Sequence, residues 1–162
     1  MRTFTPETAV DVIELQQLVV DWGHELDQGC LNVTQYFTED CFVDMGALSY
    51  TGHAAMKKFY DDRNARVLTQ QKDGIRTQRH GIASLRILVD SKDRARATFL
   101  IINFSGGGKP PLLNGTTPSI VTDVLFEFRR DTGHPWRISS FIGKPQFLGN
   151  DPFLSGGVVP KS

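Results

Sequence analysis

The sequence predicts an α+β fold: N-terminal helices packed in the concave face of a curved antiparallel sheet, forming a cone-shaped α+β barrel. Two observations support this class. Apolar residues recur at helical spacing over the first part of the chain, and from residue 75 onward they alternate with a period of two. Helices followed by a run of strands are typical of α+β domains. The length of 162 residues suits a single domain, 1–162, with a core at about 8–146 and a Gly- and Pro-rich tail at 147–162.

The first predicted helix has clear signals at both ends. Thr5 is suited to the N-cap, and Pro6 to the first helical position, where a missing N–H costs nothing. The apolar stripe continues to Leu26, and Gly29 is suited to the position just past the helix. These signals predict a helix of about six turns.

The next segment predicts a short helix, a short strand and a longer helix. Asn32 is expected to cap the short helix, and a turn at 38–40 leads into a strand at 41–45. After a loop at 46–49, the longer helix spans about 53–68. We expect Met56, Phe59, Tyr60 and Val67 on its inner face, and Lys57, Asp61, Asp62 and Arg63 on its outer face.

Four strands form the second half of the predicted fold. They are expected at 75–89, 94–104, 120–130 and 136–146, with turns at 90–93 and 131–133. The connection at 105–119 is rich in Gly and Pro, and loops of this length are often functional. We expect this loop and the Phe-bearing tail to cover the mouth of the cone.

Composition excludes several classes of protein. Eighteen Lys and Arg balance eighteen Asp and Glu, which argues against an electrostatic nucleic-acid binder or a polybasic membrane-surface protein, although not against a local patch. No apolar run approaches the roughly 20 residues of a membrane-spanning helix, and no secretory signal is recognisable. We therefore expect a cytoplasmic protein in which Cys30 and Cys41 are reduced. Eleven Phe residues suit either a core or a pocket for an apolar ligand.

Several motifs resemble the SnoaL-like branch of the nuclear transport factor 2-like superfamily. They are Trp22-x4-Asp27-x-Gly29, the run from Tyr36 to Asp44, Gly52 at a helix start, and His80 on a strand. The similarity covers about residues 8–146 and implies the cone-shaped fold. That fold is shared by scytalone dehydratase, bile-acid 7α-dehydratase, ketosteroid isomerases, polyketide cyclases and the non-catalytic β subunits of ring-hydroxylating dioxygenases. Fold alone does not choose among these functions.

The resemblance implies that Asp27 and His80 form a catalytic pair. The dehydratases use an Asp at the end of the first helix and a His on the first long strand, and these two residues match those positions. Dehydration beside a carbonyl needs a base for the C–H proton and an acid for the departing hydroxyl, which suits imidazole near neutral pH. A carboxylate beside the ring would orient it. The alternative is a solvated Asp27 and a surface His80.

Substrate-binding candidates follow from the same comparison and from the strand pattern. Asn103 lies on an otherwise apolar strand face, so its amide either holds a substrate oxygen or is satisfied by backbone groups. Trp22 stands where the related enzymes tend to have Tyr, and is either a stacking wall or part of the core. The remaining candidates are Tyr36, Tyr50, Met45 and Phe59. In the related enzymes the hydroxyl of that Tyr polarises a substrate carbonyl, and Tyr36, Tyr50 or Tyr60 could supply such a hydroxyl here.

A second arrangement would resemble the ketosteroid isomerases. Asp44 matches their general-base position and is the alternative base, with Asp123 close to the second acid position. A slip of one residue would move Asp123 to the opposite strand face. His24 is a further candidate for the site, and Arg137 and Lys144 are either near the mouth or solvated.

The chain contains no metal-ligand spacing and no phosphate loop, so we expect no metal and no cofactor. Together these features predict a cofactor-independent lyase or isomerase, dehydratase-like, acting on a small hydrophobic cyclic or aromatic hydroxy-carbonyl compound. The alternatives are a non-catalytic β subunit of a ring-hydroxylating dioxygenase and a small-molecule-binding module. We expect a homodimer or homotrimer that binds neither nucleic acid nor membrane.

Overall fold

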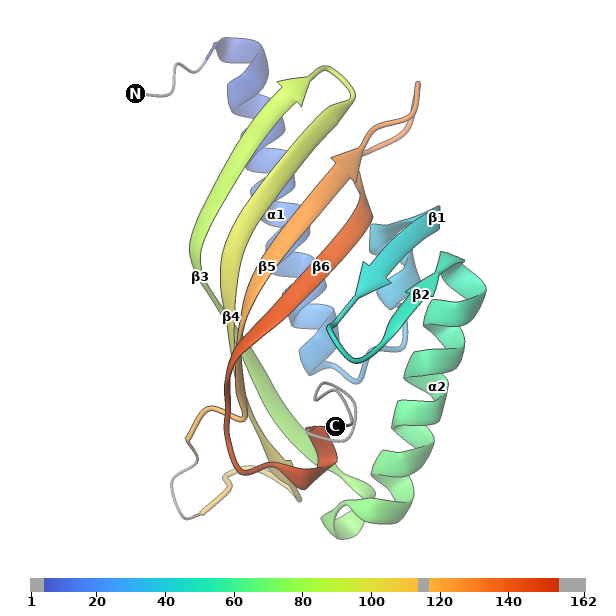
Figure 1. The fold of residues 1–162 in the computed structure, drawn as a ribbon, viewed down its shortest axis with the longest axis vertical. Helices are drawn as coiled ribbons and strands as arrows, with labels where there is room; N and C mark the ends of the chain where they lie inside the picture. Colours follow the sequence, from blue (N-terminus) through green and yellow to red (C-terminus); the bar gives the residue numbers. More distant parts are fainter. Residues whose placement is uncertain (1–4, 114–116, 155–162) are drawn as a thin grey trace.

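The computed structural model describes residues 5–113 and 117–154, and it has the α+β class predicted from the sequence (Figure 1). In chain order the elements are α1 (Pro6–Asp27), η1 (Val33–Tyr36), β1 (Phe37–Asp44), β2 (Ser49–Thr51), α2 (Gly52–Gln70), η2 (Lys72–Gly74), β3 (Arg76–Ser91), β4 (Arg94–Gly107), β5 (Ile120–Arg129) and β6 (Arg137–Leu148). Positions 114–116 of the predicted loop and 155–162 of the predicted tail lie outside the described residues.

The six strands form one curved sheet in the order β2-β1-β6-β5-β4-β3. Strands β3 to β6 make the antiparallel meander expected from the period-two pattern. The sheet as a whole is mixed, however, because β1 runs parallel to β6. Strands β2 and β3 are its two edges, so the predicted barrel is not closed. Parallel pairing needs a long connection, which the whole chain between β1 and β6 supplies.

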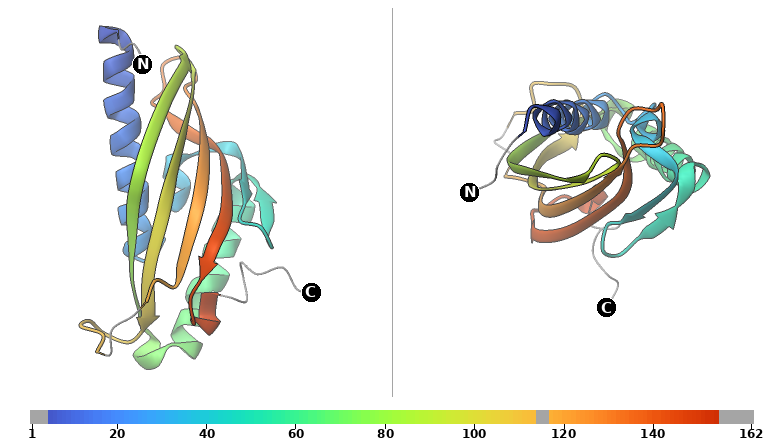
Figure 2. Two further views of the ribbon diagram at one scale, coloured as in Figure 1. Left: turned by 60° about the vertical axis from the view of Figure 1, so that its left-hand side comes forward. Right: turned by 90° about the horizontal axis from the view of Figure 1, so that it is seen from above.

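Helix α1 lies along the sheet beside β3 and packs its apolar stripe into the concave face (Figure 2). Its start is as predicted, with Pro6 in the first turn and the Thr5 hydroxyl accepting a hydrogen bond from the Thr8 N–H. Near its other end, Trp22 meets Phe126 and Phe141 edge to face, with ring centroids 4.9 and 5.6 Å apart. These aromatic contacts fix the last turns of α1 against β5 and β6.

Helix α2 packs at the opposite end of the sheet from β3, next to β1 and β2 (Figure 2). It begins at Gly52, whose φ of +82° favours glycine, and it buries Met56 completely. Neither long helix carries an apolar stretch sufficient to cross a membrane, and the same holds for the other helical segments of the described chain.

The segment between the two helices differs from the prediction. Asn32 makes no side-chain cap; its backbone N–H donates to the Glu25 carboxylate at 2.7 Å, and the expected short helix is a single 3-10 turn. The expected turn at 38–40 lies inside β1, because a register shift between Phe37 and Phe42 breaks the alternation that would reveal a strand. Strand β2, missed beyond the loop at 46–49, is too short to produce a pattern.

Candidate active site

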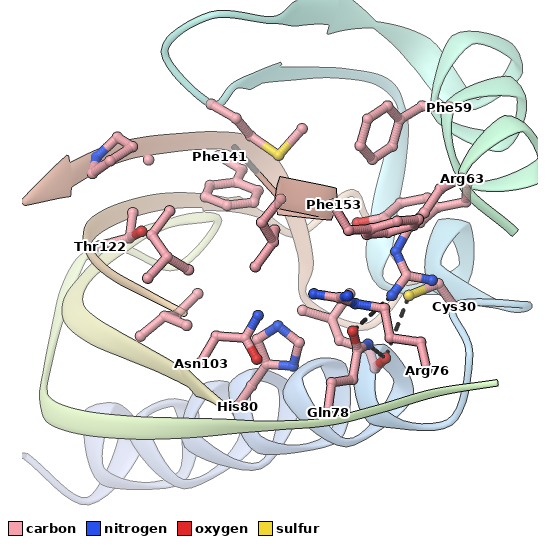
Figure 3. A pocket seen from close by; sticks show the side chains of 18 of the residues that line it. Cys30, Phe59, Arg63, Arg76, Gln78, His80, Asn103, Thr122, Phe141 and Phe153 are labelled. Carbon is pink, nitrogen blue, oxygen red and sulfur yellow. Dashed lines mark hydrogen bonds between the residues drawn. The ribbon is translucent and has the colours of Figure 1, made fainter. Parts of the chain in front are cut away.

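A cavity of about 160 Å³ opens between the concave face of the sheet, the C-terminal end of α1 and the inner face of α2. An engineered cavity of roughly 150 Å³ holds one benzene molecule, so this volume suits a ligand of about one ring. Trp22, Phe59 and Phe141 form apolar walls, and β3 contributes polar side chains (Figure 3).

Asp27 and His80 meet at one side of this cavity. His80 Nδ1 lies 2.7 Å from Asp27 Oδ1, and both side chains are nearly buried, with 12% and 11% of their surface exposed. The His80 backbone N–H also donates to this carboxylate, at 3.1 Å to Oδ1. His80 lines the cavity and Asp27 stands behind it. Because Asp27 accepts the Nδ1 proton, Nε2 is left without a protein partner among the described residues.

Asn103 lies directly across from His80, because the two residues are paired in the register of β3 and β4 (Figure 3). Its side chain is buried in the cavity wall, and its Oδ1 has no hydrogen-bond partner in the described chain. Trp22 Nε1 is equally buried and unpartnered there. A buried polar group without a partner destabilises a fold by about 1–3 kcal/mol, so two of them beside one cavity point to polar atoms of a ligand.

Arginines gather at the other side of the cavity, where Arg63 and Arg76 lie near Phe153 (Figure 3). We call this the arginine end; Arg66 also belongs to the lining. Arg76 donates to Asp151 at 2.6 Å and to the Ser105 hydroxyl at 2.6 Å. The guanidinium groups of Arg66 and Arg76 lie 5.1 and 4.5 Å from the centre of the Phe153 ring. Phe153 comes from the predicted tail, so part of that tail does contribute to the cavity wall.

Cys30 and Tyr60 in the wall are held in their protonated forms, and Asp151, which lies behind Arg76 and outside the lining, is held in its charged form. Burial raises the pKa of the Cys30 thiol to about 11, which argues against a reactive thiolate. Burial also raises the pKa of the Tyr60 hydroxyl well above its usual value. For Asp151, burial acts to raise the pKa, but the hydrogen bond and charge of Arg76, together with the hydrogen bonds from Ser105 and the Phe153 N–H, outweigh it, and the net shift is downward.

Two of the four further substrate-binding candidates line the cavity. Met45 and Phe59 do so. Tyr50 lies outside the lining, on the edge strand β2, and stacks on Phe59 with centroids 5.5 Å apart. Tyr36 also lies outside it, at the end of η1. Of the tyrosines, Tyr60 reaches the wall, because it follows Phe59 on the inner face of α2.

The alternative isomerase-like pair is not assembled. Asp44 lies outside the lining, where it accepts a hydrogen bond from the Gly46 N–H at 2.8 Å in the turn after β1. Asp123 is exposed on the outer face of β5, opposite Lys144, and Thr122 takes the inward position. This is the one-residue slip that the sequence left open. His24 is exposed on the last turn of α1, and Arg137 also lies away from the cavity.

Within the described residues, no three His, Cys, Asp or Glu side chains lie close enough together to hold a metal ion. The Phe excess is divided between roles: Phe59, Phe141 and Phe153 line the cavity, whereas Phe37, Phe99, Phe126 and Phe128 belong to the buried core.

No family model matches the sequence, and no curated protein matches it. Solved structures, in contrast, match the fold of the chain. A candidate scytalone dehydratase from Novosphingobium aromaticivorans is 16% identical, with 89% of each chain covered and a TM-score of 0.68. The β subunit of benzoate 1,2-dioxygenase from Burkholderia mallei is 13% identical, with 90% of this chain and 93% of that chain covered and a TM-score of 0.68.

A protein of unknown function from Nostoc punctiforme, described as having a cystatin-like fold, is 15% identical, with 90% of this chain and 97% of that chain covered and a TM-score of 0.66. The chain has the nuclear transport factor 2-like fold. At these identities the likeness establishes the fold and leaves the activity open.

On this nuclear transport factor 2-like scaffold, sequence reasoning missed the arginine end. Arg63 was expected on the outer face of α2, but it lines the cavity. A usable signal exists: Phe59, Arg63 and Arg66 recur at spacings of four and three, which places them on one helical face. Gln78 was also missed, although it alternates with Arg76 and His80 on the inward face of β3.

Proposed function

We propose that the protein is a cofactor-independent lyase or isomerase that removes a proton beside a carbonyl of a small cyclic or aromatic hydroxy-carbonyl compound. The leading reaction is a dehydration. The observation that carries the proposal is the 2.7 Å contact between His80 Nδ1 and Asp27 Oδ1, with the imidazole on the wall of a ring-sized apolar cavity.

In the proposed reaction His80 moves the proton. Nε2 takes the proton from the carbon beside the carbonyl, and the electron pair of that C–H bond forms an enolate. The enolate then forms the C=C bond while the C–O bond to the hydroxyl breaks. The imidazolium returns its proton to the departing oxygen, which leaves as water. In an isomerase, the same proton would return to a different carbon.

Asp27 is proposed to hold the ring and to stabilise the imidazolium that forms during the reaction. Its carboxylate accepts from both the Nδ1 position and the backbone N–H of His80, so the ring has one orientation. This division of roles is the one found in nucleophile–His–Asp triads, where the carboxylate fixes the tautomer and does not itself carry the proton.

Asn103 and Trp22 are proposed to stabilise the enolate oxygen. The Asn103 side chain lies across from His80, and its Nδ2 group is the part that can donate to an enolate oxygen, since Oδ1 only accepts. The Trp22 indole N–H is a buried donor with no partner among the described residues. Donors already aimed at the position where charge develops need no reorganisation during the reaction. An indole N–H donates without being an acid, so the proton transfers remain with His80.

The test is turnover of cyclic β-hydroxy ketones, beginning with 3-hydroxycyclohexanone, followed by the ultraviolet absorbance of the conjugated enone. His80→Gln is expected to lower kcat/KM about 10³-fold, the usual contribution of a general acid–base. His24→Gln is the matched control, since His24 is exposed and lies outside the cavity lining. Equal activity of His80→Gln and His24→Gln would overturn the proposal.

Two non-enzymatic functions are the competing proposals. Likeness to a dioxygenase β subunit supports a scaffolding role, and the cavity supports a ligand-binding module. Size-exclusion chromatography with light scattering separates the first, because a self-contained homodimer or homotrimer favours the enzyme. We propose that state, and a cytoplasmic location, for this protein. A ligand-binding module would keep its ligand affinity in His80→Ala and would show no turnover in any variant.

A further inference from the structure

The cavity carries an excess of positive charge that the neutral composition of the chain conceals. Three guanidinium groups, those of Arg63, Arg66 and Arg76, belong to its lining, and no Asp or Glu does so within the described residues. Of the nearby carboxylates, Asp27 is bound to His80 and Asp151 to Arg76. One of the three arginines therefore has a described counter-charge.

The other two arginines lack an acidic partner in the described chain. Arg63 donates only to neutral amides, at 2.9 Å to Asn64 Oδ1 and 2.7 Å to Gln78 Oε1. The Arg66 guanidinium makes no hydrogen bond to a described residue, and lies over the Phe153 ring. Both side chains are half-buried. Guanidinium groups with free N–H donors in a partly desolvated wall match the planar, two-oxygen geometry of a carboxylate.

Strand β3 sets the separation between this charge and the dyad. Arg76, Gln78 and His80 alternate along one face of the strand, and all three line the cavity. Gln78 holds the Arg63 guanidinium, and its own Nε2 is fixed by the Leu26 carbonyl. Two residues along a strand correspond to roughly 7 Å. The Arg63 guanidinium, held by Gln78, is thus about one substituted ring away from the His80 imidazole, and Arg66 lies on the same helical face one turn further along α2.

We propose that Arg63 and Arg66 bind the carboxylate of a ring-sized substrate whose reacting carbon lies at His80. The placement of the reacting carbon rests on the proposed function; the recognition of the carboxylate does not. The substrate class is then a monocyclic hydroxy-carbonyl compound that also carries a carboxylate. Its ring lies against Trp22, Phe59 and Phe141. Arg76, already paired with Asp151, holds the Phe153 ring that closes this end.

The test is isothermal titration calorimetry with benzoate and its neutral counterpart benzamide on the full chain. Benzoate is expected to bind at least about tenfold more tightly, because each hydrogen bond to a charged group is worth that much. Arg66→Gln is expected to weaken benzoate about tenfold and to leave benzamide unchanged. This variant removes a charge without breaking a hydrogen bond between described residues. The control is Arg86→Gln, which removes the same charge from an exposed position of β3.

Equal affinities for benzoate and benzamide, no measurable benzoate binding, or equal effects of Arg66→Gln and Arg86→Gln would each overturn the inference. Phenyl phosphate is titrated in parallel, and binding tighter than that of benzoate would overturn the assignment to a carboxylate. His80→Gln is expected to keep its benzoate affinity while it loses turnover. Loss of the arginine effect with the His80 effect intact would therefore reject this inference alone, and the reverse would reject only the dyad.

Discussion

Helix α1 presents a nearly buried carboxylate at each end, and the two have different partners. Near its start, Asp11 accepts from Arg130 at 2.7 Å and from the Trp136 indole N–H at 3.1 Å. Arg130 stacks on the Trp136 ring, 4.4 Å from its centre. At the other end, Asp27 accepts from the backbone and the imidazole of His80.

The partners decide what each carboxylate can do. A guanidinium and an indole keep their protons near neutral pH, so the Asp11 cluster can only hold the first turns of α1 against the connection between β5 and β6. An imidazole exchanges its proton in that range, and the His80 ring has its free nitrogen beside a cavity. The same residue type on the same helix is therefore structural at one end and a candidate for catalysis at the other.

The largest expected difference is in stability. Asp11→Ala is expected to lower the free energy of unfolding by about 3 kcal/mol, because it leaves a buried indole N–H and a half-buried guanidinium without their acceptor. Asp27→Asn retains an acceptor oxygen and is expected to cost about 1 kcal/mol or less. Urea unfolding of both variants measures the difference. Equal losses would remove the distinction between the two ends.

Asn103→Leu sharpens the distinction, because it should move stability and activity in opposite directions. Replacing a buried amide that has an unpartnered oxygen by an apolar side chain of similar size is expected to raise the free energy of unfolding by about 1 kcal/mol. Turnover is expected to fall at least about tenfold, since one donor to the enolate is lost. Thermal unfolding and kcat/KM, measured on the same preparation, check both. A loss of stability would mark Asn103 as a structural amide.

The smallest expected effect extends the comparison to a third carboxylate, Asp151. Its pKa lies below the ordinary value of 3.8 in the folded protein, so its contact with Arg76 stabilises the fold above that pH. The contribution disappears as the pH falls through the lowered pKa. We expect the free energy of unfolding of wild type to exceed that of Asp151→Asn by about 1 kcal/mol near pH 6. Urea unfolding at a series of pH values should show this difference shrinking towards pH 3. A difference that grows on acidification would contradict this.

The elements that the sequence predicts best are those with local signals. Thr5 and Pro6 mark the start of α1, and the period of two marks β3 to β6. The parallel pairing of β1 with β6 could not be read from the sequence, because it joins strands about 100 residues apart and β1 carries a register shift.

The candidate site divides in the same way. Asp27 and His80 could be nominated from their positions relative to a helix end and a strand, and the fold brings them within 2.7 Å. The spacing from Phe59 places Arg63 on the same helical face, but spacing does not tell whether a charged side chain on that face is solvated or lines a cavity. Arg63 borders the charged run of α2, and only the packing of that helix against β3 and Phe153 turns it inward. Burial of charge beside a cavity depends on tertiary contacts. The overall composition of the chain does not show which charged residues those contacts bring together.

The most direct test of the account is a double-mutant cycle on Asp27 and His80, with kcat/KM for a cyclic β-hydroxy ketone as the readout. If Asp27 acts only by orienting and stabilising His80, each single variant is strongly impaired, and adding Asp27→Asn to His80→Gln causes little further loss. Independent, multiplying losses would contradict the dyad. Full activity of Asp27→Asn would contradict it as well.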